Sequence, residues 1–398
     1  MATNNNYLTG KEIRAIAKEN AKQMKRLEAY KNRKAKESEF LSKMKNDANI
    51  LEIEDLHTYF FTEQGTVKAV NGVSYDVPKN SVVGIVGESG CGKSVTSMSV
   101  MRLIQGPTGQ IVDGSIRFKA YDYARDGKGK PIKDGNGFRY EEKVYDIAKM
   151  PIHEIHRIRG KQIAMIFQEP MTSLNPVFTI GEQLDEVTMI HVPGATKELA
   201  KAKSEEMLRL VGIIPENVYK AFPHELSGGM RQRVMIAMAL AAEPRLIIAD
   251  EPTTALDVTI QAQILDLLQD IKRKIDGSIL LITHDLGVIA EMADYVVVMY
   301  AGKVIEKGTV YEIFQDPKHP YTIGLQKSKP TMTLDDSTEL YNIPGNVPNP
   351  VNMPSHCYFK ERCSKCTAKC SGEYPGMVQV SPTHFVACHL YDEENSNG

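Results

Sequence analysis

An octet of small and polar residues, Gly87–Ser94, fits the pattern G-x-x-x-x-G-K-[ST] and directly follows the apolar run Val82–Val86. In such a loop, glycines let the backbone turn so that successive N–H groups face a phosphate, and the helix beginning near Lys93 adds its positive N-terminal end. Lys93 is then expected to neutralise the phosphates of a nucleotide, and the Ser94 hydroxyl to bind Mg²⁺. The expected nucleotide-binding residues are Gly87, Ser89, Gly90, Cys91, Gly92, Lys93, Ser94 and Val95.

Two adjacent carboxylates, Asp250 and Glu251, follow the apolar run Leu246–Ala249. Burying two like charges at a strand end is costly unless a cation is present. An Asp that helps to hold Mg²⁺, followed by a Glu that takes a proton from water, explains both carboxylates at once. An isolated Asp-Glu pair is more often a solvated loop, so the phosphate loop upstream is what favours catalysis. Asp250 is the expected metal ligand and Glu251 the expected general base.

These residues need a scaffold of buried strands and helices to bring them together. Short β-type runs begin at Leu51 and are followed by apolar runs typical of parallel strands buried on both faces. Those runs are Val82–Val86, Leu246–Ala249, Ile279–Ile282 and Tyr295–Met299. Helical periodicity covers Ile180–Val211 and Met230–Leu240. Strands that alternate with helices predict an α/β layered domain, which we place at residues 49–320.

Composition limits the functions that the chain can have. The 398 residues carry 48 Lys or Arg against 50 Asp or Glu, a net charge of −2, which argues against a nucleic-acid partner bound through its phosphates. No run approaches the roughly 18 apolar residues that span a membrane, and no signal peptide is recognisable. We therefore expect a cytoplasmic protein.

Three segments lie outside this pattern. Residues 1–48 hold twelve Lys or Arg and six Asp or Glu, so they carry about +6 while the remainder carries about −8. They predict a basic, mostly solvated helix with a flexible linker, or alternatively a helix that contacts anionic lipid or an acidic partner. Residues 121–144 predict a peripheral polar hairpin or loop. Residues 321–398 are Pro-rich and then Cys-rich, and predict a small irregular C-terminal region.

A further segment, Leu226–Arg233, reads LSGGMRQR and lies 23 residues before Asp250 (250 − 227, counted from Ser227). It resembles the signature of the ATP-binding cassette superfamily, which generic phosphate-loop enzymes lack. The other elements of that family follow the same order along the chain: Gln168 resembles the Q-loop glutamine, Asp257 the D-loop aspartate and His284 the switch histidine. Phe60 matches the aromatic residue that stacks on adenine, although the adjacent Tyr59 is an alternative.

The resemblance implies a fold and a mechanism. The fold is the ABC nucleotide-binding domain, a parallel sheet core with an antiparallel β subdomain and an α-helical subdomain at about residues 169–240. Two cassettes pair head to tail, and the signature of one closes over the ATP of the other; the signature residues are Leu226, Ser227, Gly228, Gly229, Met230, Arg231 and Gln232. His284 and Gln168 would act in catalysis with Glu251, and Ser94, Gln168 and Asp250 would hold Mg²⁺.

Long stretches look like the D-type ATPase subunits of oligopeptide and dipeptide permeases. They include Met165–Pro176, Gly229–Met238 and Asp250–Thr259. Such a subunit is an ATPase coupled to peptide import at the cytoplasmic face of the membrane. Its family partners are an F-type ATPase paralogue, suggested by Met230, two transmembrane permeases and an extracytoplasmic peptide-binding protein. Nickel or another small solute is an alternative cargo, and a soluble ABC ATPase outside transport is a more remote alternative.

Five of the six cysteines fall between Cys357 and Cys388. The spacing of Cys357, Cys363, Cys370 and Cys388 resembles the C-terminal pattern of this permease branch, in which four cysteines hold a [4Fe–4S] cluster. Thiolates at this density also suit Zn²⁺, with His356 or His389 as further ligands, or they remain reduced without metal. Cys366 is surplus to the cluster pattern.

Overall fold

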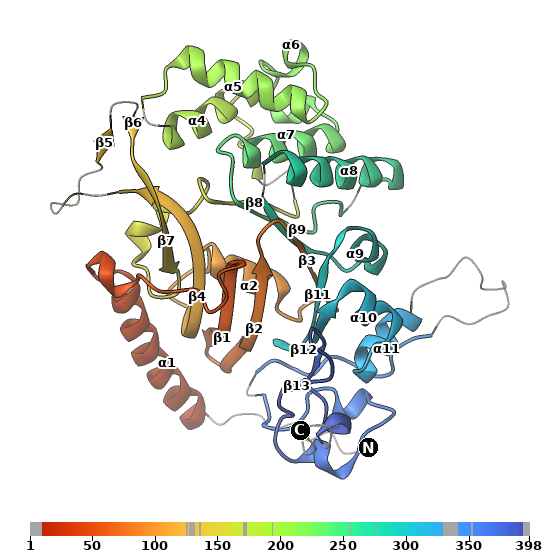
Figure 1. Cartoon of the computed structure of the whole chain (residues 1–398). Helices are drawn as coiled ribbons and strands as arrows, with labels where there is room; N and C mark the ends of the chain where they lie inside the picture. The colour runs from red at the N-terminus through yellow and green to blue at the C-terminus, as the bar shows by residue number, and fades with distance from the viewer. Residues whose placement is uncertain are drawn as a thin grey trace.

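The computed structural model describes residues 10–124, 126, 132–134, 137–169, 173–192, 194–254, 256–275, 277–328, 341–351 and 353–392. Within these residues, two large sheets and the helices around them form the molecule in Figure 1. Gly127 and Gly135, the glycines of the two Asp-Gly turns in the predicted insert, lie outside the described residues.

The larger sheet has eight strands in the order β13-β14-β12-β11-β3-β10-β9-β8. The five strands from β11 to β8 run parallel to one another, and the other three continue the sheet in antiparallel pairs. The parallel strands are β3 (Val82–Val86), β8 (Ile163–Ile166), β9 (Leu246–Asp250), β10 (Ser278–Ile282) and β11 (Tyr295–Tyr300). The other three are β12 (Lys303–Thr309), β13 (Val378–Gln379) and β14 (Phe385–Val386). All four apolar runs that predicted parallel strands are confirmed.

These strands are apolar throughout because both faces of the sheet are covered. Along β3, Val83 and Ile85 face one hydrophobic core while Val82 and Val86 face the other. Leu246 and the other residues of β9 alternate between the two cores in the same way. A strand buried on both faces has no place for a polar side chain until its end. Polar groups therefore collect where the strands stop.

The smaller sheet is antiparallel, with the order β2-β1-β4-β7. Its strands are β1 (Asn49–Thr62), β2 (Gly65–Pro78), β4 (Gly109–Tyr123) and β7 (Tyr140–Asp146). Helix α2 (Lys93–Val100) contacts β1, β2 and β9, so it lies between the two sheets. The predicted insert is a hairpin of β4 and β7 that carries the short pair β5 (Lys133–Asp134) and β6 (Gly137–Phe138).

The remaining helices cover the other face of the larger sheet and extend beyond it (Figure 1). They are α4 (Ile180–His191), α5 (Lys197–Leu210), α6 (Pro215–Val218), α7 (Gly228–Leu240), α8 (Val258–Ile275), α9 (Leu286–Met292), α10 (Val310–Gln315) and α11 (Pro320–Lys327). The helical pattern predicted over 180–211 is confirmed as the two helices α4 and α5. The chain turns at Gly194, whose φ is +75°, and Thr196 then caps α5.

The N-terminal segment is folded onto the smaller sheet, and the expectation of a flexible linker after the helix is wrong. Helix α1 (Gly10–Lys31) contacts β1, β2 and β4, and Asn20 donates a hydrogen bond to the Thr62 carbonyl at 2.8 Å. After the helix, Phe40 is 1% exposed and packs on Tyr145 in the core between the sheets. The buried side chain of Phe40, which follows the basic helix α1, therefore holds the N-terminal segment against the smaller sheet.

The C-terminal residues 341–351 and 353–392 have little regular structure but share the main core. Tyr358 and Phe359 belong to the hydrophobic cluster of the larger sheet, and β13 and β14 extend that sheet beyond β12. His384 is buried and its Nε2 lies 2.7 Å from the carboxylate of Glu306, which is also buried. Among the described residues, no helix is long and apolar enough to cross a membrane.

We predict that Phe40→Ala lowers the free energy of unfolding by about 3–5 kcal/mol, because it empties a fully buried aromatic site. Chemical denaturation of the full chain would measure the change. Leu41→Ala is the matched control, since its side chain is 42% exposed and its loss should cost under about 1 kcal/mol. Equal effects of the two variants would mean that residues 37–47 do not anchor the segment.

Candidate active site

The phosphate loop joins the end of β3 to the start of α2. Gly87, Gly90 and Gly92 all have φ between +79° and +150°, a region that disfavours side chains. A Cβ on Gly87 would lie 2.2 Å from the Met299 carbonyl oxygen, and one on Gly92 would lie 2.4 Å from the Ala69 carbonyl oxygen. Only glycine therefore fits at these two positions of the loop.

Lys93 and Ser94 open helix α2 at the base of this loop. The Lys93 ammonium is buried and donates hydrogen bonds to the carbonyl oxygens of Gly87, at 2.7 Å, and Glu88, at 3.2 Å. The Ser94 hydroxyl donates to the Asp250 carboxylate at 3.0 Å. Burial raises the pKa of Asp250, and the Ser94 hydrogen bond opposes that rise. The structure thus joins two residues that are 156 positions apart in one polar pair.

Three side chains converge on a single oxygen of Glu251. Its Oε2 accepts hydrogen bonds from the Gln168 amide at 2.8 Å and from the Thr254 hydroxyl at 2.9 Å, and lies 3.4 Å from Nδ1 of His284. Gln168 follows β8, Glu251 follows β9 and His284 follows β10 by two residues, so the parallel sheet brings all three to one edge. The φ of Glu251 is +48°, a strained value for a side-chain-bearing residue, of the kind that clusters at functional sites.

The signature residues lie at the start of α7. Ser227 caps that helix by accepting a hydrogen bond from the Met230 N–H at 3.3 Å. Arg231 donates to the carbonyl oxygen of Pro223, and the buried Gln232 amide donates to that of Pro252 at 2.6 Å. Gln232 therefore connects the signature helix to the loop that follows Glu251. The described hydrogen bonds of Ser227 and Gln232 do not reach the phosphate loop of the same chain.

Phe60 and Tyr59 point to different surroundings on β1. Phe60 pairs with Gly109 across the sheet, and its ring lies 2.9 Å from where a Gly109 Cβ would be. The Tyr59 hydroxyl donates to the Asn71 side chain at 2.9 Å, and Asn71 in turn donates to the Tyr358 hydroxyl. The Tyr59 hydroxyl is thus part of a hydrogen-bond network with Asn71 and Tyr358, and Phe60 is not part of that network.

Asp257 begins helix α8. Its carboxylate accepts a hydrogen bond from the Ile260 N–H at 3.0 Å, which satisfies a free backbone donor in the first turn. The contacts of Asp257 are therefore local in this chain, and they do not bring it to Glu251.

A contact from the C-terminal region to the phosphate loop escaped the sequence analysis. Both carboxylate oxygens of Glu88 accept hydrogen bonds from the Arg362 guanidinium, at 2.8 and 3.0 Å. The Glu88 N–H donates to the Tyr321 hydroxyl at 2.8 Å. Glu88 and Arg362 are 274 residues apart, and no spacing rule links them. The one feature of the sequence that could have indicated a cationic partner is Glu88 itself, an acidic side chain inside a loop that binds anions.

The four cysteines of the predicted cluster lie in one neighbourhood. The Cys357 N–H donates to the Cys370 carbonyl oxygen at 3.3 Å, and burial raises the pKa of the Cys388 thiol to about 11, with Cys357, Cys363 and Cys370 adding to the rise. Across the part of the chain that the structure describes, however, no three His, Cys, Asp or Glu side chains are placed to hold a metal ion. The side-chain geometry therefore supports neither the zinc site nor the iron–sulfur site.

The fold and the site together define the class of the protein. A strand–loop–helix phosphate site, a strand-end Asp-Glu pair and a helical region whose helix α7 opens at LSGG are the parts of an ATP-binding cassette ATPase. The ABC transporter family model matches residues 70–254. A second model, the C-terminal region of oligopeptide/dipeptide transporters, matches residues 305–370.

The chain belongs to the oligopeptide/dipeptide transport family of ABC ATP-binding proteins. It is 46% identical over 351 residues to the oligopeptide transport ATP-binding protein AppD of Bacillus subtilis, covering 88% of this chain and 99% of AppD. Two other B. subtilis proteins are similarly related. The oligopeptide transport protein OppD is 49% identical, with 86% of this chain and 88% of OppD covered. The dipeptide transport protein DppD is 47% identical, with 86% and 95% covered.

Solved structures share the fold. The ATP-binding cassette MJ0796, in a dimeric post-hydrolysis state with ADP and Pi, has a TM-score of 0.53 and 23% identity, covering 65% of this chain and 98% of MJ0796. CbiO1 of Clostridium perfringens has a TM-score of 0.51 and 24% identity, covering 70% and 96%. At this identity the comparison establishes the cassette fold alone.

We predict that Arg362→Ala raises the dissociation constant for ATP about three- to ten-fold, because the Glu88 carboxylate loses two charge-assisted hydrogen bonds and the phosphate loop loses a support. Fluorescent nucleotide titration would measure it. The control is Lys360→Ala on the same turn, where the lysine pairs only with the exposed Glu361.

A double-mutant cycle with Glu88→Gln separates this contact from a general effect on the C-terminal region. The two substitutions should be clearly less than additive in ATP binding. Full additivity would show that Arg362 does not act through Glu88.

Proposed function

We propose that this chain is the ATP-hydrolysing subunit of an importer for oligopeptides or dipeptides. The observation that carries the proposal is the convergence of Gln168, Thr254 and His284 on the Glu251 carboxylate, beside the Ser94–Asp250 pair. The names of AppD, OppD and DppD support peptide as the cargo. Nickel import and soluble ABC functions have no comparable support among these relatives.

The chemistry follows from the groups at the strand ends. The loop N–H groups and Lys93 hold the phosphates of ATP, and Phe60 stacks on adenine. Glu251 takes a proton from the attacking water while His284 and Gln168 hold that water near the γ-phosphate. Mg²⁺, when bound by Ser94, Asp250 and Gln168, would neutralise phosphate charge. Hydrogen-bond donors from Gln168 and Thr254 already surround the Glu251 carboxylate and orient it.

The active unit is a pair of cassettes, and the second is an F-type paralogue. Support comes from the start of the signature helix, where the described hydrogen bonds of Ser227 and Gln232 are made with Met230 and Pro252 rather than with the phosphate loop of the same chain. The first-turn N–H groups of Gly228 and Gly229 suit a γ-phosphate supplied by the partner. A cassette alone is then a poor ATPase.

The chain works at the cytoplasmic face of the membrane, bound to two permease subunits. An extracytoplasmic peptide-binding protein delivers the cargo to those permeases, so the peptide does not bind the ATP site. Gln168 supports the coupling step: it lies at the start of the segment leading to the helical region, and its amide also binds Glu251. A movement of that segment would change the environment of the base.

We predict that Glu251→Gln lowers ATP turnover in the assembled transporter at least about 100-fold and leaves the dissociation constant for ATP nearly unchanged, because an amide cannot accept the proton. Phosphate release would measure ATP turnover, and uptake of labelled peptide into proteoliposomes would measure transport, which should be lost together with turnover.

Glu243→Gln provides a matched control, since Glu243 also has a positive φ but lies on the surface, where it pairs with Lys203. Its turnover should match the wild type. Wild-type turnover in the Glu251 variant would exclude Glu251 as the base. If the wild-type transporter hydrolyses ATP but takes up no peptide, the chain remains an ATPase and this cargo is excluded.

We further propose that Cys357, Cys363, Cys370 and Cys388 hold a [4Fe–4S] cluster that ties down the C-terminal region. The support is the cysteine pattern of the family, which Cys357, Cys363, Cys370 and Cys388 match in spacing. A cluster bonds each thiolate to a different iron, so its ligands lie farther apart than those of a single ion. The cluster would have a structural role, because this region is otherwise mostly irregular.

Anaerobically purified chain should then contain about four iron and about four acid-labile sulfide per molecule. Cys370→Ser should lose both, because Cys370 is buried in the group. Cys366→Ser, the exposed and surplus cysteine, should retain them. Zinc without sulfide, or iron retained in the Cys370 variant, would overturn the assignment.

A further inference from the structure

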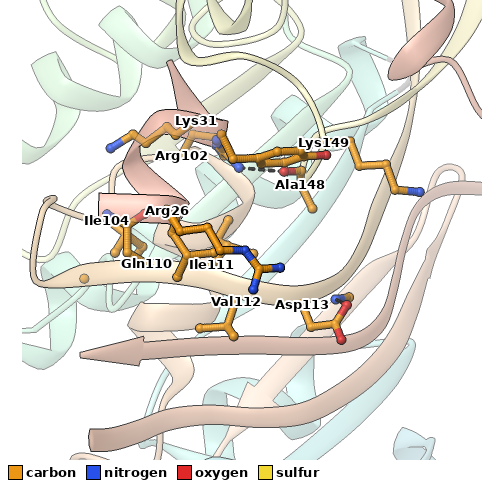
Figure 2. Close-up of a pocket in the computed structure, with 14 residues that line it drawn as sticks. Arg26, Lys31, Arg102, Ile104, Gln110, Ile111, Val112, Asp113, Ala148 and Lys149 are labelled. Carbon is orange, nitrogen blue, oxygen red and sulfur yellow. Dashed lines mark hydrogen bonds between the residues drawn. The ribbon is translucent and has the colours of Figure 1, made fainter. Parts of the chain in front are cut away.

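A cavity of about 450 Å³ lies between helix α1 and strand β4, on the smaller sheet and away from Glu251. Figure 2 shows it with Arg26 and Lys31 from α1 on one side and the residues of β4 on the other. Its charged lining residues are Arg26, Lys31, Arg102, Lys149 and Asp113. Four cations and one carboxylate line it directly. Asp146 and Glu28 pair with Lys149 and Lys31 from outside the lining, so Arg26 and Arg102 carry the positive charge that has no ion-pair partner among the described residues.

Arg102 is the central group of this pocket. It is only 9% exposed, and its one described hydrogen bond goes from Nη1 to the Ala148 carbonyl oxygen at 2.8 Å. No described carboxylate accepts a hydrogen bond from it, and the Ala148 carbonyl is the one described acceptor for its five N–H donors. Burial lowers the pKa of Arg102 to about 10, which still leaves it charged at neutral pH. A buried cation without a counter-ion is costly.

The nearest acidic groups are committed elsewhere. Asp146 accepts hydrogen bonds from the Ser115 hydroxyl at 3.0 Å and pairs with Lys149 at 3.0 Å. Glu28 accepts from the Gln110 amide at 2.7 Å. Asp113 lies at the exposed rim and caps the Gly114 N–H. Asp146 and Glu28 act on the Arg102 charge only through space, and none of the three carboxylates accepts a described hydrogen bond from it.

The helix side of the pocket supplies further cations and is held firmly. Arg26 has no described hydrogen bond or ion pair, and the Lys31 ammonium lies 3.9 Å from Glu28. Arg33 donates to the Lys149 carbonyl oxygen at 2.9 Å and stacks on Tyr30, which fixes the end of α1 over the cavity. Leu27 and Ile111 add apolar surface to the lining.

We propose that this cavity is a binding site for a phosphate monoester or diester. Cations from α1, from Arg102 two residues after α2 and from Lys149 approach from different directions, which suits a tetrahedral anion better than a flat carboxylate. Arginine binds phosphate through several N–H donors at once. The volume exceeds that of inorganic phosphate, so the rest of the ligand lies along Leu27 and Ile111. The phosphate belongs either to a soluble metabolite or to a lipid headgroup.

The test uses the full chain with Lys93→Ala, so that anions do not bind at the ATP site. The probes are glycerol 3-phosphate, by calorimetry, and vesicles of phosphatidylglycerol against phosphatidylcholine, by co-sedimentation. The phosphate site predicts binding of one probe that weakens at least about ten-fold in Arg102→Met and in Arg26→Gln/Lys31→Gln. Lys197→Gln, an exposed lysine on α5, is the control and should bind as the parent does.

Binding of glycerol 3-phosphate identifies a soluble ligand, and binding only to phosphatidylglycerol vesicles identifies a lipid headgroup. Binding unchanged in both pocket variants, or weakened equally in the control, overturns the site. The same holds if neither probe binds. If Arg102→Met does not fold, the Arg26→Gln/Lys31→Gln variant still decides. Arg26 is exposed and makes no described hydrogen bond or ion pair, and the one described ion pair of Lys31 is the weak 3.9 Å contact with Glu28.

Discussion

The structure depends on one electrostatic constraint, the placement of two adjacent carboxylates at the end of a strand buried on both faces. Asp250 is almost fully buried, and the Ser94 hydroxyl is its described partner. Glu251 follows it with a left-handed backbone that turns its side chain toward Gln168 and His284. Repulsion between the two carboxylates makes the pair unfavourable without hydrogen-bond donors and a cation. The neighbouring strand ends supply these donors, since β3, β8 and β10 all stop at the same edge.

Much of this arrangement could be predicted from the sequence because its signals are local. The parallel strands are recognisable as continuous apolar runs, because a strand covered on both faces does not alternate between apolar and polar residues. The phosphate loop follows one such run directly, and the Asp-Glu pair follows another. Once parallel strands are assumed, their carboxyl ends must share an edge, so Ser94 and Asp250 had to be near one another. The helical periodicity over 180–211 is confirmed as α4 and α5, and the Pro193-Gly194 pair in the sequence marks the turn between them.

Contacts between distant segments were beyond sequence reasoning. Nothing in the local pattern around Phe40 distinguishes it from a residue in a solvated linker, because its burial depends on packing against Tyr145 of β7 in the core between the two sheets. The same holds for Arg362, whose guanidinium reads as an ordinary charge in an irregular region. Such residues acquire their role only when another element, 100 or more positions away, provides a partner that matches them in shape or charge.

The Glu88–Arg362 pair changes how the C-terminal region should be understood. By sequence it seemed an irregular segment that followed the ATPase domain, whereas Tyr358 and Phe359 lie in the main core and Arg362 holds a side chain of the phosphate loop. Tyr321 binds the backbone of the same residue, so two C-terminal elements fix Glu88. Because that loop must keep its N–H groups aligned toward a phosphate, any rearrangement among the cysteines, which begin five residues before Arg362, would be transmitted to the ATP site. The conformation of the phosphate loop therefore depends on the folded structure of the C-terminal region, through Glu88 and its partners Arg362 and Tyr321.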